Sequence, residues 1–83
     1  MNMRDLILEF KRLDDLIHRR ATESPDKLAE KFGMSESSMK RHLREFKDTF
    51  DAPVVYDREA ETYHYTKPFN LMAQIERLLK GRD

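Results

Sequence analysis

The sequence predicts a small, mostly α-helical domain that carries one β-hairpin toward its C-terminal end. Apolar residues recur at helical spacing in two long segments, 3–20 and 36–50. Between these segments, Pro25 and Gly33 stand where residues that favour the start and the end of a short helix are expected. After residue 53 the pattern changes to short runs of β-branched and aromatic residues, which are typical of strands.

The central stretch 24–50 predicts two helices joined by a tight turn. Ser24 is expected to cap a helix over 25–32, and Gly33 is expected to end it in the left-handed conformation that other residues resist. Ser35 is placed to cap the second helix, over 36–50. The apolar positions of this second helix, spaced by four, three and four, predict one buried stripe made of Met39, Leu43, Phe46 and Phe50.

Elements on either side of this stretch complete the expected fold. A first helix over 3–20 has an apolar stripe, formed by Met3, Leu6, Phe10, Leu13 and Ile17. A last helix over 71–80, with Asn70 as its cap, has an apolar side formed by Leu71, Ile75, Leu78 and Leu79. The segment 53–66 predicts a hairpin with strands at 54–56 and 63–65, in which Tyr63 and Tyr65 share one face. The loop between these strands has no glycine or proline, so its turn geometry is not specified.

The order of helix, glycine turn and capped helix resembles a helix-turn-helix. The segment LAEKFGMSESSMKRHLREF is similar to the N-terminal winged helix-turn-helix of DeoR-type and WYL-domain bacterial transcription regulators, which read L-A-x-x-[FL]-x-V-S-x-x-T-[IV]-x-R-D-L-x-x-L. The matching places are occupied here by Met34, Ser38, Met39, Arg41, His42, Leu43 and Phe46. Ser38 replaces the usual Thr, and His42 departs from the usual Asp.

The resemblance covers roughly residues 6–69 and implies a single winged helix-turn-helix domain over 1–83, with a three-helix core, a two-stranded wing and a C-terminal helix. It implies sequence-specific binding of double-stranded DNA in transcription regulation. Because such regulators often have a ligand-sensing domain after the wing, the chain is expected to be a standalone regulator or an N-terminal fragment.

Charge is distributed unevenly along the chain, although 16 Lys and Arg balance 16 Asp and Glu. Four basic residues face one acidic residue between Lys40 and Lys47, whereas segment 50–66 contains four acidic residues and one basic residue. A neutral chain is unusual for a nucleic-acid binder, since contacts to phosphate supply much of the affinity. The positive segment nevertheless falls on the helix that the resemblance assigns to base recognition.

Helical spacing separates the residues of this helix into a buried side and an exposed side. At 100° per residue, Ser37, Arg41, Arg44 and Asp48 lie opposite the apolar stripe. The expected DNA contacts are made by Ser35, Ser37, Ser38, Lys40, Arg41, Arg44, Lys47 and Arg58. The alternative is an ordinary solvated helix face, on which Arg44 pairs with Asp48.

The expected wing is acidic. Asp57, Glu59 and Glu61 would repel phosphate, so either the wing stays off DNA and covers the core, or Arg58 alone reaches the DNA. A module that binds protein through this acidic wing is the alternative function. The tyrosines of the hairpin could stack on single-stranded bases, but such aromatic residues more often pack against the core.

Several other classes of function are disfavoured. The chain has no cysteine, which excludes disulfides, thiolate zinc sites and a cysteine nucleophile. Its three histidines lie on three different elements, and no phosphate-binding glycine loop or nucleophile motif is present. We therefore expect no metal, no cofactor and no enzymatic activity. Without a signal peptide or a long apolar run, we expect a cytoplasmic protein with no membrane partner.

The first and last helices predict self-association. The apolar residues of 71–80, together with Met72, and Leu8 on the first helix give more apolar surface than one small core requires. We expect a two-fold homodimer through these helices, with both recognition helices on one side. The alternative is a monomer in which all of this surface packs internally.

Overall fold

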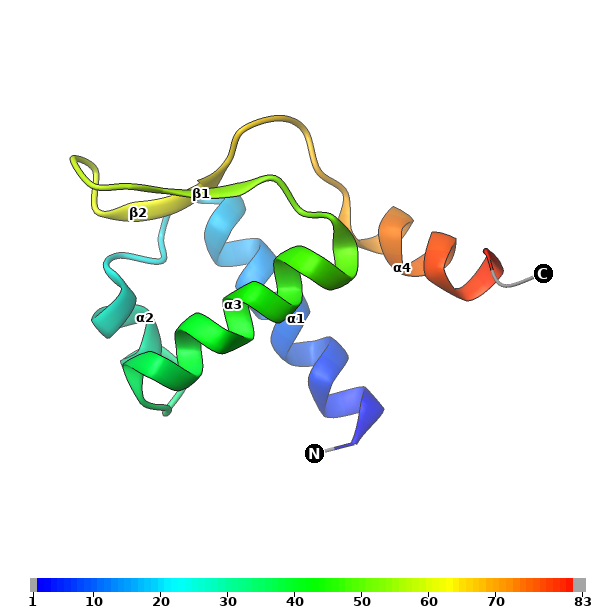
Figure 1. Ribbon diagram of the computed structural model, residues 1–83, viewed down its shortest axis with the longest axis horizontal. Coiled ribbons are helices and arrows are strands. Elements are labelled where there is room, and N and C mark those ends of the chain that lie inside the picture. The colour runs from blue at the N-terminus through cyan, green and yellow to red at the C-terminus, as the bar shows by residue number, and fades with distance from the viewer. Residues whose placement is uncertain (1, 82–83) are drawn as a thin grey trace.

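The computed structural model describes residues 2–81 and contains four helices and a two-stranded antiparallel hairpin (Figure 1). The elements are α1 (Met3–His18), α2 (Pro25–Lys31), α3 (Glu36–Phe50), β1 (Val54–Asp57), β2 (Thr62–Tyr65) and α4 (Leu71–Lys80). Their order is the predicted one and is compatible with a winged-helix layout. The first helix ends two residues and the second one residue before the predicted ends, and each strand is one residue longer than predicted.

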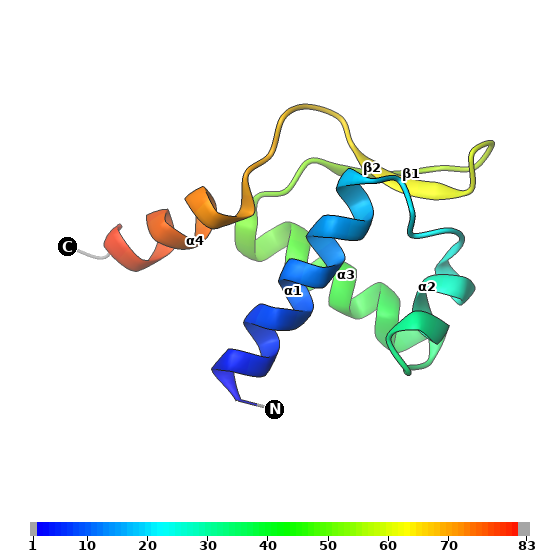
Figure 2. The same ribbon diagram turned by 180° about the vertical axis from the view of Figure 1, so that it is seen from behind.

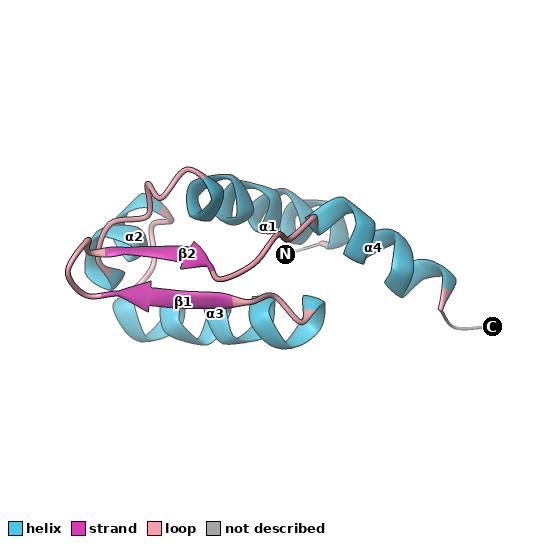
Figure 3. Cartoon of the chain, turned by 90° about the horizontal axis from the view of Figure 1, so that it is seen from above, coloured by secondary structure: helices cyan, strands magenta, loops and turns pink. Residues whose placement is uncertain are grey.

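The molecule is thin, measuring 42 × 30 × 17 Å, and its two long helices cross. Helix α3 lies in front of α1 in Figure 1 and behind it in Figure 2, so one side of each helix faces outward. In Figure 3 the hairpin lies above α3, with its turn and α2 at one end of the molecule and α4 at the other. Among residues 2–81, no helix has the length and apolar character needed to cross a membrane.

The core forms where α1, α2 and α3 meet. Phe46 is fully buried, and its ring lies 5.5 Å from the rings of both Phe10 and Phe50 and 6.1 Å from that of Phe69. All four residues of the predicted α3 stripe are buried. Each large apolar side chain removed from water in this way contributes roughly 1.5–3 kcal/mol. Burial of one stripe therefore fixes which side of α3 remains exposed.

Local signals explain most of the helix ends. The Ser35 hydroxyl accepts a hydrogen bond from the backbone N–H of Ser38 at 3.2 Å, and the Asn70 side chain caps α4 by accepting one from Ala73 at 3.0 Å. Gly33 has a φ of 65°, the left-handed conformation that was predicted to end the preceding helix. These caps and this turn are confirmed.

The predicted capping role of the Ser24 side chain is wrong. Ser24 occupies the cap position of α2, but its hydroxyl makes no hydrogen bond to a backbone N–H. It donates instead to the carboxylate of Asp26, which lies in the first turn of the same helix. A hydrogen bond to an ionised acceptor is stronger than one to a neutral partner, which favours the side-chain position that reaches Asp26. In that position the Ser24 oxygen accepts from no backbone N–H. This contact lowers the pKa of Asp26 below its ordinary value.

The hairpin turn is built by the side chain of Asp57, which was expected only to repel phosphate. The strands pair from Val54 with Tyr65 to Asp57 with Thr62. The Asp57 carboxylate accepts hydrogen bonds from the backbone N–H groups of Glu59 at 2.9 Å and Ala60 at 3.1 Å. Asp commonly stabilises turns in this way, which explains how the loop closes without glycine or proline.

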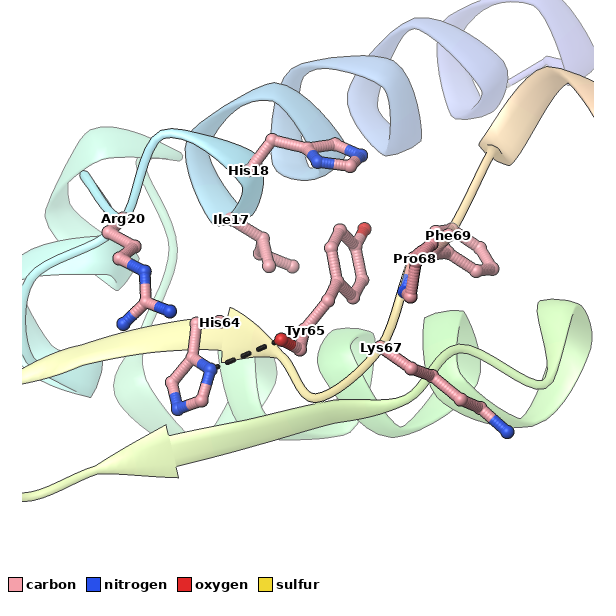
Figure 4. Close-up of a pocket in the computed structure, with 8 residues that line it drawn as sticks. All are labelled: Ile17, His18, Arg20, His64, Tyr65, Lys67, Pro68 and Phe69. Atoms are coloured by element: carbon pink, nitrogen blue, oxygen red, sulfur yellow. Dashed lines mark hydrogen bonds between the residues drawn. The ribbon is translucent and has the colours of Figure 1, made fainter.

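Three hydrogen bonds attach β2 to α1 and to the connector that follows α1. The buried Thr22 hydroxyl accepts from the backbone N–H of Tyr63 at 2.8 Å and lies 3.1 Å from the Thr62 hydroxyl. The Tyr65 hydroxyl donates to the Asp14 carboxylate of α1 at 2.7 Å. In Figure 4 the Tyr65 ring rises from β2 toward His18 of α1, and the ring centres lie 4.8 Å apart.

Burial raises the pKa of Tyr65, and its hydrogen bond to the Asp14 carboxylate raises it further. Because the neutral hydroxyl is favoured in the folded state, its contribution to stability is complete below about pH 10, the pKa of an unfolded tyrosine. It is lost as the pH rises above that value, since the unfolded chain then ionises first.

Replacing Tyr65 by Phe should lower the free energy of unfolding by about 1–2 kcal/mol at neutral pH, because the hydrogen bond to Asp14 is removed. When the pH is raised from about 9 to about 11, the free energy of unfolding should fall less in this variant than in the wild type. Urea unfolding at both pH values measures this, with Tyr56→Phe as the control, because the Tyr56 hydroxyl has no hydrogen-bond partner in the described part of the chain. Equal alkaline losses in the wild type and Tyr65→Phe would contradict the expectation.

Candidate nucleic-acid interface

The side of α3 opposite the core is open to solvent. Ser37, Arg41, Arg44 and Asp48 are all exposed, as helical spacing predicts. In Figure 1 α3 crosses in front of α1, so the side of α3 turned to the viewer faces away from α1. Figure 2 shows the same crossing from behind. The exposed side runs along most of the 15-residue helix and is not covered by another element.

Hydroxyl groups surround the start of α3. Ser35 Oγ lies 2.9 Å from Ser38 Oγ, to which it donates, and 3.4 Å from Ser37 Oγ. The Ser35 hydroxyl is thus engaged within the protein as a cap. The Ser38 hydroxyl accepts from Ser35, so its own proton remains available to a ligand. Because the Ser35 proton is used for Ser38, the exposed Ser37 is the donor in its longer contact with Ser35.

The basic residues of α3 differ in whether they already have a partner. Lys40 Nζ lies 3.2 Å from Glu36 Oε2, one turn earlier on the helix. Within residues 2–81, Arg41, Arg44 and Lys47 make no ion pair. The pairing of Arg44 with Asp48 that an ordinary solvated face was expected to show is therefore not formed. Three cationic side chains on α3 remain free to meet an anionic partner.

These cations lie on two sides of α3. Lys40, Arg44 and Lys47 line a shallow groove of about 200 Å³ against the hairpin, where they meet Tyr63. The Tyr63 hydroxyl is protonated at neutral pH, as an ordinary tyrosine is, and burial raises its pKa further, so it can act as a donor. Arg41 borders a second groove, of about 380 Å³, on the side of α3 that faces α1.

The hairpin turn carries the remaining predicted site residue. Arg58 is exposed in the turn and lines neither of the two grooves beside α3. Its neighbours Asp57, Glu59 and Glu61 surround it with negative charge. The structure therefore brings together the predicted residues of α3 but leaves Arg58 apart from them.

His42 connects α3 to α1, a role that the sequence analysis did not identify. Its Nε2 lies 3.0 Å from Glu9 Oε1, although the two atoms are not aligned as a hydrogen bond, and its ring stacks on that of Phe10 at 5.2 Å. Its Nδ1 lies 3.9 Å from Glu45 Oε1 on the same helix. An Asp at this position, as in the family that the sequence resembles, would place a second carboxylate beside Glu9. The departure at His42 thus has a local physical reason.

A pocket of about 230 Å³ between α1 and β2 gathers other basic residues without forming a ligand site (Figure 4). His18 and Lys67 point in different directions, and His64 Nδ1 lies 3.2 Å from the backbone carbonyl of Tyr65. In the portion of the chain covered by the structure, no three His, Asp or Glu residues come together as metal ligands would.

Known proteins provide no assignment for this site. No family model, curated protein or solved structure matches the chain. What the exposed side of α3 can do must therefore be argued from its own residues.

The contact between His42 and Glu9 should contribute to stability. Replacing each by Ala singly and both together should give a coupling free energy of about 1 kcal/mol, because the pair is close and mostly shielded from water. The pair of His42 and Glu45 is the matched control, and it should couple less because its atoms are 3.9 Å apart and Glu45 is exposed. Urea unfolding provides the four free energies of each cycle. Equal coupling in the two cycles would show that Glu9 has no particular role.

Proposed function

We propose that this chain is a winged helix-turn-helix domain that binds double-stranded DNA in transcription regulation. The proposal is carried by one observation, the three cations of α3 that are unpaired within the described residues, of which Arg41 and Arg44 lie opposite a fully buried stripe. In this proposal α2 and α3 are the two helices of the motif, α3 is the recognition helix, and the hairpin is the wing.

In this proposal some residues of α3 contact base edges and others contact phosphate. An α-helix fits the major groove of DNA, and an arginine can donate to O6 and N7 of one guanine together. Arg41 and Arg44, at the middle of the exposed side, are the candidates for contacts to base edges. Lys40 and Lys47 lie toward the hairpin and suit phosphate, as do the hydroxyls of Ser37 and Ser38 near the start of the helix.

The wing in this proposal stays off the DNA. Its turn presents three carboxylates and one cation, so bringing it close to phosphate would cost electrostatic energy. The wing would instead cover the core through Val54 and Tyr65 and form one side of the groove at Tyr63.

A protein-binding module is the second candidate function. The acidic turn and the zero net charge favour it, because a DNA-binding domain usually has excess positive charge. The two candidates differ in their response to salt. Binding to phosphates releases counterions, so the affinity for DNA must fall steeply as the salt concentration rises.

Arg41→Ala should weaken binding to a duplex selected from a random pool by about 5- to 150-fold, which corresponds to about 1–3 kcal/mol, and relax the preference at one base position. Lys40→Ala should weaken binding to selected and random duplexes about equally, as expected for a phosphate contact. Fluorescence anisotropy at about 50 and about 200 mM salt measures both effects.

Arg19→Ala is the matched control for these variants. It removes one exposed positive charge from the C-terminal end of α1, where Arg19 already pairs with Asp15 at 2.9 Å. Its affinity for DNA should remain close to that of the wild type. If Arg41→Ala is folded and binds the selected duplex as tightly as Arg19→Ala, α3 is not the recognition helix.

Neutralising the acidic turn separates the two candidate functions. The combined variant Asp57→Asn, Glu59→Gln and Glu61→Gln should bind DNA as well as the wild type or more tightly, since repulsion is removed. Asn at position 57 retains the oxygen that accepts the turn hydrogen bonds, so the hairpin should remain folded. Anisotropy with the same duplex provides the measurement, and a loss of affinity would show that the acidic wing takes part in binding.

A further inference from the structure

Helix α4 leaves most of its apolar side uncovered. It extends away from the other helices in Figures 1 and 2, and Leu71 is its one buried residue. Ile75 is half-buried, whereas Leu78 and Leu79 are 48% and 77% exposed. Only part of this apolar side therefore covers the core, through Leu71 and Ile75.

The uncovered side of α4 forms one wall of an apolar groove of about 310 Å³. The opposite wall is the first half of α1, and the end of α3 closes the groove. Its main lining residues are Met3, Ile7, Phe50, Ile75, Leu78 and Leu79. Met3 is 72% exposed, so the stripe predicted for the first helix is not buried at that end either. Leu8, which was expected to belong to this surface, does not line the groove.

We propose that this apolar groove binds the α4 helix of a second copy of the chain, forming a two-fold homodimer. A two-fold interface uses the same patch on both subunits, so that patch must carry both a hollow and a ridge that fills it. Both are present here. Leu78 and Leu79 line the groove of their own copy, and because they remain 48% and 77% exposed they can also contact the groove of a partner.

Charged residues that flank the groove without lining it also favour a second copy as the occupant. On α1, Arg4 and Lys11 lie one turn on either side of Ile7 and Leu8, and on α4, Glu76 lies beside Met72 and Leu79. All three are exposed, and within the described residues 2–81 none of them makes an ion pair. When α4 of each copy docks into the groove of the other, Glu76 of each copy can lie near Arg4 and Lys11 of the other. The zero net charge of the chain removes overall repulsion between copies.

The amount of exposed surface agrees with an unfilled interface. The chain exposes 5940 Å², whereas a folded monomer of 10.0 kDa is expected to expose about 5,200 Å². At the groove itself, Met3, Leu78 and Leu79 are 72%, 48% and 77% exposed and contribute to this surface.

Exchange of charges between two variants tests this pairing directly. Glu76→Lys alone, and Arg4→Glu combined with Lys11→Glu, should each raise the dimer dissociation constant at least tenfold in sedimentation equilibrium without DNA. An equimolar mixture of the two variants should dimerise as the wild type does, because a heterodimer restores opposite charges at both contacts. If the mixture remains monomeric while the wild type is dimeric, the proposed pairing is wrong.

Removal of apolar contacts tests the groove itself. Leu79→Gln should raise the dissociation constant at least tenfold, and circular dichroism should show a folded monomer because Leu79 is mostly exposed. Val55→Gln, which removes an exposed apolar residue of β1 outside the groove, should leave dimerisation unchanged. The proposal would be overturned if the wild type stayed monomeric up to about 1 mM protein, a concentration at which even weak association is detected. Equal dimerisation of Leu79→Gln and Val55→Gln would also overturn it. These measurements contain no DNA, so their outcome is independent of the function proposed for α3.

Discussion

The buried hydroxyl of Thr22 is the contact on which the position of the hairpin depends. Two strands alone are marginally stable in water, and each has one unpaired edge. Thr22 covers the edge of β2 by accepting from the backbone N–H of Tyr63, and Tyr65 attaches the same strand to Asp14 of α1. Once the strand is held at these points, Val54 and Tyr65 can pack over the core. The groove between Tyr63 and α3 follows from that placement.

Helix α3 combines a structural and a chemical role by separating them around its circumference. Met39, Leu43, Phe46 and Phe50 commit one stripe to the core, which fixes the rotation of the helix. Its orientation is fixed further by His42, which lies against Glu9 and Phe10 of α1. The backbone positions of Arg41 and Arg44 are thereby fixed on the surface, although their side chains make no ion pair within the described residues.

Features that depend on residues close together in the sequence could be predicted, whereas contacts between distant residues could not. The bounds of α3 could be predicted to the residue, because Ser35 and the spacing of the apolar residues are local signals, and the exposed side followed from 100° per residue. The contacts of Thr22 with Tyr63 and of Asp14 with Tyr65 join residues 41 and 51 positions apart and leave no local pattern. The predicted cap at Ser24 was wrong because its hydroxyl is oriented toward the Asp26 carboxylate and accepts from no backbone N–H. At the candidate site, the pairing of Lys40 with Glu36 is a contact between residues four apart on α3, which local spacing could have predicted. The separation of the cations between two grooves required the positions of neighbouring elements.

The separation of charge between α3 and the hairpin turn gives this neutral molecule an electric dipole. A polyanion attracts the basic side of α3 and repels the acidic turn, so it exerts a torque on the whole domain before contact. The torque acts only within about 8–10 Å at physiological ionic strength, because mobile ions screen it beyond that distance. A neutral protein with this arrangement gains no long-range attraction, but within that distance a polyanion favours the orientation in which α3 faces it.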